Sequence, residues 1–263
     1  MSPGLGQPLQ VLVTGAAGFV GRALVTRLQR QRSLGGQAIG GLTLMDMVRL
    51  DPADDPSIRQ LVGGIADPSF VARGFERAVD VVIHLASVPG GTAEQQPVLA
   101  RDVNLQGTLH LLDACAAQVE AGGPVPRFVF ASTIAVYGTS LPAQVDDATP
   151  PRPALSYGAH KLMGEIAVAD LTRRGGCQGL SLRLPGVLAR PPARTGQLSA
   201  FLSELMRDPA ARRDVVCPMS ASATTWAAST PNAVDNLLHA ACVDTAGLPP
   251  HRALTLPALH FSM

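Results

Sequence analysis

The sequence predicts an α/β fold, in which helices cover both faces of a doubly wound parallel sheet. Short apolar runs rich in β-branched residues alternate with longer helical stretches along the chain. Continuously apolar strands are typical of parallel sheets that are buried on both faces. Two Pro- and Gly-rich stretches, 139–155 and 185–197, interrupt the alternation. Such loops follow the carboxyl ends of parallel strands, where ligands bind in open α/β sheets.

The position of each run gives the expected elements in order. Apolar runs predict strands over 9–15, 42–46, 79–86, 127–133 and 179–186. The stretches between them predict helices over 18–32, 98–119 and 157–174.

The last part of the chain is expected to form a small cap over the carboxyl edge of the sheet. It contains predicted helices over 198–207 and 231–243 and a predicted strand over 252–257. No clean linker separates this part from the rest. We therefore expect two intertwined domains, a sheet domain over 1–185 and a cap over 186–263.

Composition narrows the classes of partner. Hydrophobic residues make up 46% and charged residues 16%, and the net charge is +1 without a basic run, so nucleic acid is not expected as a partner. The four cysteines lack CxxC spacing, which indicates no disulfide framework and no metal site, and favours a reducing cytoplasm. No signal peptide opens the chain and no apolar run is long enough to span a membrane.

A glycine-rich turn between the first strand and its helix predicts a dinucleotide site. In "VTGAAGFVG", Gly15, Gly18 and Gly21 permit a tight turn and close approach of a pyrophosphate to the helix N-terminus. Asp46 ends the second predicted strand, where a carboxylate can accept hydrogen bonds from the adenosine ribose. It would repel a 2′-phosphate, which favours NAD over NADP, although Arg49 lies three residues on.

Tyr157 and Lys161 lie four positions apart at the start of a predicted helix, so they share one helix face. This spacing occurs by chance in many helices, and its meaning depends on the other motifs.

Taken together, the motifs resemble those of the extended short-chain dehydrogenase/reductase family, whose sheet is Rossmann-like. The matching segments are "TGAAGFVG", "GGIADP", "HLAS", "VNLQGT", "STIAVYG" and "SYGAHK". The resemblance implies NAD as the cofactor and Tyr157, Lys161 and Thr133 as catalytic residues. It implies the following cofactor-binding residues: Gly15, Ala17, Gly18, Phe19, Val20, Gly21, Asp46, Ala66, Asp67, Leu85, Ala86, Ser87, Asn104, Ser132, Tyr157, Lys161 and Pro185.

The chemistry needs these residue types. A tyrosine hydroxyl has a pKa near 10, which makes it a poor base at neutral pH. The Lys161 ammonium and an oxidised nicotinamide are expected to lower the pKa of Tyr157. By resemblance, Thr133 holds the substrate oxygen while its proton leaves.

Three features narrow the activity within the family. The residues after Thr133 are Ile134 and Ala135, not the Asp-Glu pair of nucleotide-sugar dehydratases, so dehydration is excluded. The chain stops at Met263, which leads us to expect a shortened cap and little of an epimerase's nucleotide-binding domain. Runs such as "RFVFASTIAVYGTSLP" and "SLRLPGVLARPP" resemble the D-erythronate dehydrogenase subgroup. Oxidation of the C2 hydroxyl of a short sugar acid is therefore the implied activity.

The sequence departs from that subgroup next to Trp226, a residue that could close the pocket. Thr224 and Thr225 stand where the subgroup carries an arginine just before the tryptophan, and the following run "AAST" is one residue longer.

A sugar acid needs a partner for its carboxylate. Arg190 is the first candidate and Arg194 the second, because a guanidinium makes two parallel hydrogen bonds to a carboxylate. Ser87 and Thr133 are further candidates for substrate contact. His84 is expected to be a core histidine with satisfied hydrogen bonds.

Two other activities stay open. One is a nucleotide-sugar 4-epimerase with tightly held NAD, and the other is an NAD-binding protein without catalysis. By family resemblance we also expect a homodimer, in which the helices over 98–119 and 157–174 form a four-helix bundle.

Overall fold

The computed structural model describes residues 7–50, 55–146, 148–191 and 200–263. Its main sheet has the strand order β10-β7-β6-β5-β1-β3-β2, with β4 also paired to β3. Every ladder in this sheet is parallel except the hairpin between β2 and β3. The strands are β1 (Leu9–Thr14), β2 (Ser33–Leu34), β3 (Gln37–Asp46), β4 (Ile58–Val62), β5 (Val81–His84), β6 (Arg127–Thr133), β7 (Gln178–Leu184) and β10 (Ala253–Thr255).

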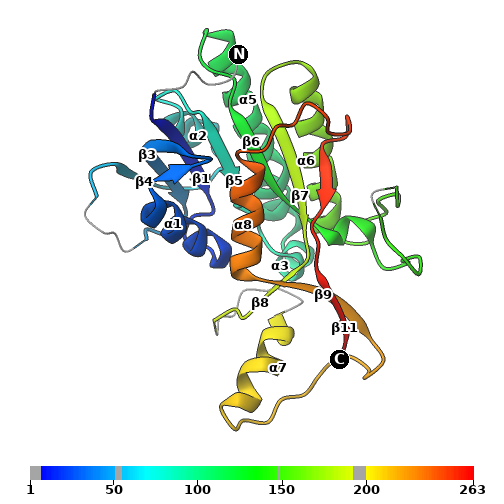
Figure 1. The fold of residues 1–263 in the computed structure, drawn as a ribbon. Coiled ribbons are helices and arrows are strands. Elements are labelled where there is room, and N and C mark those ends of the chain that lie inside the picture. The colour runs from blue at the N-terminus through cyan, green and yellow to red at the C-terminus, as the bar shows by residue number, and fades with distance from the viewer. Residues whose placement is uncertain (1–6, 51–54, 147, 192–199) are drawn as a thin grey trace.

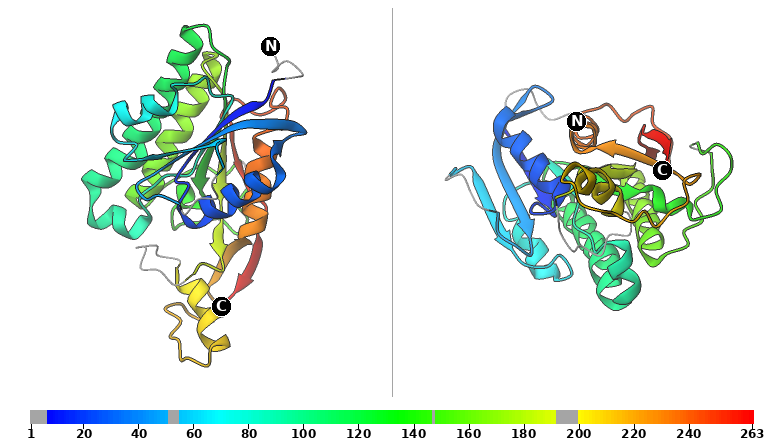
Figure 2. Two further views of the ribbon diagram at one scale, coloured as in Figure 1. Left: turned by 90° about the vertical axis from the view of Figure 1, so that its left-hand side faces the viewer. Right: turned by 90° about the horizontal axis from the view of Figure 1, so that it is seen from below.

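Helices cover both faces of this sheet (Figures 1 and 2). On one face lie α1 (Phe19–Gln31) and α8 (Thr230–Ala240). On the other lie α2 (Pro68–Gly74), α5 (Gly107–Glu120) and α6 (Ser156–Arg173). The predicted doubly wound α/β fold is therefore confirmed.

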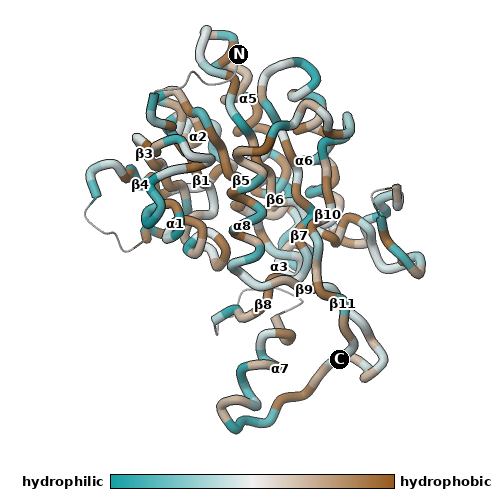
Figure 3. Tube along the Cα trace, viewed as in Figure 1, coloured by the Kyte–Doolittle hydropathy of each residue, from teal (hydrophilic) through white to brown (hydrophobic). Residues whose placement is uncertain are grey.

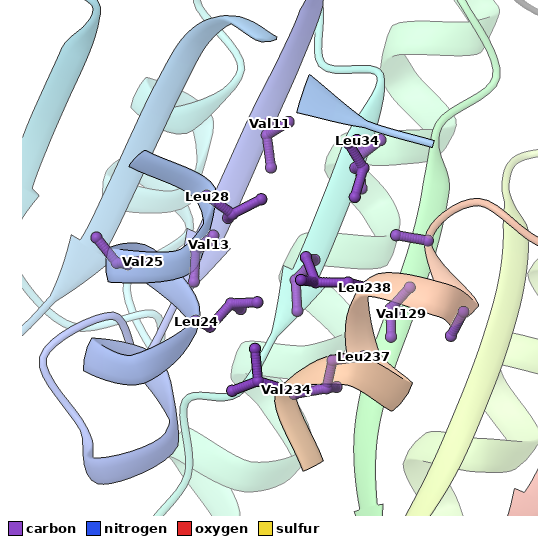
Figure 4. Close-up of a cluster of buried hydrophobic side chains, with 14 of the residues drawn as sticks. Val11, Val13, Leu24, Val25, Leu28, Leu34, Val129, Val234, Leu237 and Leu238 are labelled. Carbon is purple, nitrogen blue, oxygen red and sulfur yellow. The ribbon is translucent and has the colours of Figure 1, made fainter. Parts of the chain in front are cut away.

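Each face of the sheet buries its own apolar cluster. On the first face, Leu24 and Leu28 of α1 meet Val234 and Leu237 of α8 above the strands (Figure 4). On the second face, residues of α2, α5 and α6 pack against Phe128 and Phe130 of β6. Apolar segments accordingly run through the strands at the centre of the molecule (Figure 3). Because both faces are covered, the carboxyl edge of the sheet is left for binding.

A second, small sheet and one helix lie at this edge. In the small sheet, β8 (Gly186–Leu188) pairs in parallel with β9 (Thr224–Ser229), and β9 pairs antiparallel with β11 (Leu259–Ser262). Beside them lies α7 (Phe201–Ala210), below the main sheet in Figure 1. Two elements from the C-terminal part, α8 and β10, belong instead to the layers of the main sheet.

Several elements differ from the prediction. The expected helix over 98–119 is a helical run from Pro97 to Glu120 made of α4 (Pro97–Arg101), a π-helical turn (Asp102–Gln106) and α5. The stretch expected to be a loop over 185–197 contains β8, and the short helix α3 (Gly90–Gln95) was not predicted.

The missed strands share a physical cause. In β4 one of five residues is buried, and in β11 none is, so neither shows the continuous apolar run of a central strand.

Within the described ranges, none of the helices is both long and apolar enough to cross a membrane.

Candidate active site

The glycine turn has the geometry of a phosphate cradle. Gly15 adopts φ +69°, and a Cβ there would lie 2.6 Å from the backbone nitrogen of Ala86. A Cβ on Gly21 would lie 2.1 Å from the carbonyl oxygen of Gly15, so the first turn of α1 can approach the strand only without a side chain. Helix α1 begins at Phe19, and its N-cap residue, Gly18, has no side chain to cap it. The first N–H groups of the helix can therefore bind an anion.

Asp46 fastens this turn to the end of β3. Its Oδ2 accepts a hydrogen bond from the backbone N–H of Ala17 (2.9 Å), and its Oδ1 accepts one from Val48 (3.1 Å). The carboxylate thus lies beside the glycine turn, where an adenosine ribose would meet it.

Three of the predicted site residues lie around the hydroxyl of Tyr157. The hydroxyls of Ser87 and Thr133 and the charge of Arg190 act on it, and each lowers the pKa of Tyr157. These groups come from α6, the segment after β5, the end of β6 and the segment after β8. The structure therefore brings one phenol, two hydroxyls and one guanidinium together at the carboxyl edge of the sheet.

Burial raises the pKa of Tyr157 above its ordinary value, while the hydrogen bonds with Ser87 and Thr133 and the charge of Arg190 oppose this rise. Desolvation of the phenolate is the largest of these effects. The lowering of this pKa by the Lys161 ammonium together with an oxidised nicotinamide stays a prediction.

Lys161 is buried beneath Tyr157 and is 1% exposed. Its Nζ donates a hydrogen bond to the carbonyl oxygen of Ala131 (2.8 Å) and lies 4.6 Å from the centroid of the Phe130 ring. The same Nζ lies 5.8 Å from the centroid of the Tyr157 ring. Burial lowers the pKa of Lys161 to about 7, and the charge of Glu165 opposes this shift.

Arg190 lies between the glycine turn and Tyr157. Its guanidinium is 5.1 Å from the centroid of the Phe19 ring, and its Nε donates to the carbonyl oxygen of Val187 (3.2 Å). It lines a cavity of about 270 Å³ between the glycine turn and α7, together with Arg22 and Arg207. Arg194, the second candidate for the carboxylate, lies outside the described residues.

Asn104 and His84 support the segment that carries Ser87. The side chain of Asn104 accepts from the backbone N–H of Val88 (2.6 Å) and donates to the carbonyl oxygen of the same residue (2.9 Å). His84 is fully buried, and its two ring nitrogens bond to the hydroxyls of Thr14 (2.6 Å) and Thr108 (2.9 Å). His84 is therefore the core histidine that the sequence predicts.

The remaining predicted cofactor residues surround this centre. Asp67 caps α2 by accepting from the backbone N–H of Ser69 (2.8 Å), and Ala66 precedes it. Leu85 and Ala86 follow β5 against Gly15, and Pro185 joins β7 to β8. Phe19 and Val20 form the first turn of α1.

Ser132, a predicted cofactor-binding residue, also has a partner within the protein. Its hydroxyl donates to Glu165, which also binds Arg183. Glu165 and Arg183 are not among the residues that the motifs predict, although each carries a signal in the sequence. Glu165 follows Lys161 by four positions on the same helix, and Arg183 interrupts an apolar strand.

Trp226 lies in β9 opposite His260 of β11 and is half-buried. It belongs to the small sheet.

Among the described residues, no group of three or more His, Cys, Asp or Glu side chains could hold a metal ion.

The glycine cradle and the acidic residue at the end of β3 fit a dinucleotide, and the family match decides the class. The NAD dependent epimerase/dehydratase family matches residues 11–224. The chain belongs to this family. It is an NAD-dependent oxidoreductase, and its cofactor is NAD.

Two curated relatives and one solved structure are similar over most of the chain. The D-erythronate dehydrogenase of Cupriavidus necator is 37% identical over 95% of this chain and 78% of its own length. The D-erythronate dehydrogenase of Haemophilus influenzae is 31% identical over 95% of this chain and 77% of its own length. The structure described as the nucleoside-diphosphate-sugar epimerase from Agrobacterium tumefaciens has a TM-score of 0.91 and 33% identity, covering 100% of this chain and 78% of its own. The resemblance drawn from the motifs is thereby confirmed.

Proposed function

We propose that this protein oxidises the C2 hydroxyl of a short sugar acid, D-erythronate or a close analogue, to the 2-oxo acid. The observation that carries the proposal is the cluster at Tyr157, where the hydroxyls of Ser87 and Thr133 and the charge of Arg190 act on the phenol hydroxyl. An acid–base phenol, hydroxyl donors and a cation are the groups that a hydroxy acid needs. The two relatives named D-erythronate dehydrogenase support this choice of substrate.

The chain's own residues would hold the substrate and move its proton. Bound NAD supplies the acceptor for the hydride that leaves C2. Tyr157, as the phenolate, takes the proton of the C2 hydroxyl. Thr133 would donate a hydrogen bond to the same oxygen, and Ser87, whose hydroxyl acts on that of Tyr157, would orient the phenol. The products are the 2-oxo acid, NADH and one proton.

Arg190 would hold the substrate carboxylate. Its charge already acts on Tyr157, so a carboxylate bound to the guanidinium would place the adjacent C2 hydroxyl close to the phenol. Asp46 would accept hydrogen bonds from the adenosine ribose and favour NAD over NADP, because its charge repels a 2′-phosphate.

A second candidate function is epimerisation of a nucleotide sugar at C4. The similarity of the whole chain to the structure from Agrobacterium tumefaciens, at a TM-score of 0.91, favours it. The two functions differ in redox balance. Sugar-acid oxidation releases NADH at each turnover, whereas an epimerase keeps NAD tightly bound and releases none.

The Tyr157→Phe variant tests the role of the phenol. It removes one oxygen, so we expect the turnover number to fall about 10²–10⁴-fold. The dissociation constant of NAD, measured by calorimetry, should stay within about twofold, because the remaining cofactor contacts are intact. Unchanged turnover would exclude Tyr157 as the base.

A further inference from the structure

A buried ion pair joins α6, the helix of Lys161, to β7, the strand that pairs with the strand of Thr133. Arg183 donates to Glu165 through Nη2 (2.8 Å to Oε2) and Nε (3.0 Å to Oε1). The side chains of Arg183 and Glu165 are 7% and 3% exposed. Glu165 also accepts from the hydroxyl of Ser132 (2.5 Å). Both carboxylate oxygens of Glu165 therefore accept hydrogen bonds.

The network continues away from the carboxylate. Nη1 of Arg183 donates to the hydroxyl of Tyr137 (2.8 Å), and that hydroxyl shares a hydrogen bond with Thr255 (2.6 Å). The connected residues come from α6, β6, β7, β10 and the 3₁₀ turn Ile134–Tyr137.

Stability alone does not account for this pair. Taking two charges out of water costs several kcal/mol per ion, and apolar residues of similar volume often serve as well or better. The reason for burying this ion pair therefore lies in the residues next to it. Ser132 adjoins Thr133, and Glu165 lies one helical turn beyond Lys161.

We propose that Glu165 is a positioning residue of the active site, which fixes the end of β6 through Ser132 and places an anion one helical turn from Lys161 on α6. This inference rests on the proposed function for its catalytic meaning. Its geometric part stands on the hydrogen bonds alone. Because neighbouring strand residues point to opposite faces, anchoring Ser132 fixes the direction in which Thr133 projects.

The groups around Lys161 show why the charge of Glu165 matters to the ammonium. Tyr157 faces the ammonium from the same helix, the charge of the ammonium acts on His84 of β5, and the Phe130 ring covers the ammonium from β6. His84 stays neutral, because burial holds its pKa well below the ordinary value. Glu165, with Arg183 on its far side, is thus the anionic group that acts on Lys161 among the described residues.

The sequence offers a direct readout, because Lys161 is the single lysine of the chain. Protein labelled with ¹³C at the lysine ε position, carrying no tag lysine, gives one resonance whose pH titration reports the pKa of Lys161. In Glu165→Gln we expect this pKa to fall by about one pH unit, because an opposite charge is removed while the volume stays the same. Asp170→Asn, on the exposed face of the same helix, should leave the titration unchanged.

The same variant should lower turnover at neutral pH at least about tenfold and move the alkaline limb of the pH–rate profile down by a similar shift. An unchanged Lys161 titration in Glu165→Gln would overturn the proposal. The NMR readout needs no substrate, so failure of the proposed activity is distinguishable from failure of this inference.

A double variant covers the case in which Glu165→Gln does not fold. Glu165→Met with Arg183→Met replaces the pair by apolar side chains of similar length, which preserves packing. We expect a melting temperature close to that of the natural protein together with a lowered Lys161 pKa and reduced turnover. A folded double variant with normal titration and turnover would show a packing role alone and overturn the proposal.

Discussion

At the scale of single residues, burial controls which charges the site can hold. Burial lowers the pKa of Lys161 to about 7 and raises that of Tyr157. Both shifts favour the uncharged form of the side chain, an amine for Lys161 and a phenol for Tyr157. A base of ordinary tyrosine pKa would be almost wholly protonated at neutral pH. The positive nicotinamide and the hydrogen bonds from Ser87 and Thr133 are therefore what would favour the phenolate.

His84 gives a pH-dependent stability with a definite sign. Its folded-state pKa lies well below 6.5, so the unfolded chain takes up a proton first as the pH falls. Stability present above pH 6.5 is thus lost in acid, by up to about 1.4 kcal/mol per pH unit. In His84→Asn this contribution disappears. Urea unfolding from pH 7 to 5 should show the natural protein losing stability faster than the variant, and parallel profiles would contradict the account.

At the scale of elements, the β1–turn–α1 unit and helix α6 build most of the site. The turn depends on two positions where no side chain fits, and α6 carries Tyr157, Lys161 and Glu165 on successive turns. Each unit approaches the end of a parallel strand, which is where the connection rules of the fold place ligands.

Gly21→Ala tests the turn. The added Cβ would lie 2.1 Å from the carbonyl oxygen of Gly15, so the turn must shift. We expect the affinity for NAD to fall roughly tenfold or more, for about 1.4 kcal/mol of strain. Gly247→Ala is the matched control, because its Cβ would meet nothing within 4 Å. Calorimetry on both variants checks this, and equal affinities would contradict the role of the turn.

The elements also show what sequence could predict. The sequence predicts the strand over 127–133 and the helix that starts near Tyr157 almost to the residue. The strand is a nearly continuous apolar run, and the helix carries the Tyr157–Lys161 motif in its first turns. The small sheet was not predicted, since β8, β9 and β11 are short and partly exposed. The motifs identified Tyr157 and Lys161, which are local in sequence. The pair of Glu165 and Arg183 was missed because it joins a helix to a strand through tertiary contact.

At the scale of the whole molecule, helices α4 and α6 present an apolar surface. Val98 and Ile166 are each 63% exposed, Leu99 is 45% exposed and Met163 is 41% exposed, and α4 contacts α6. This surface lies on the helices from which the family resemblance implies a four-helix bundle. We therefore propose that a second copy of the chain covers it.

Ile166→Arg tests this association. A buried unpaired charge at the centre of the interface costs several kcal/mol, so we expect the dimer to dissociate into monomers at micromolar concentration. Sedimentation velocity distinguishes the two states. Glu120→Gln, at the end of α5, is a surface control that should leave the state unchanged. A natural protein that sediments as a monomer would contradict the proposal.

The most direct test of the central claim is the formation of NADH, followed by its absorbance, when the protein and NAD meet a panel of four- to six-carbon sugar acids. D-Erythronate belongs in the panel because two relatives carry its name. The account predicts steady release of NADH with a short acid and loss of that signal in Tyr157→Phe. Confirmed binding of NAD with no NADH from any acid would contradict it and favour the redox-neutral epimerase.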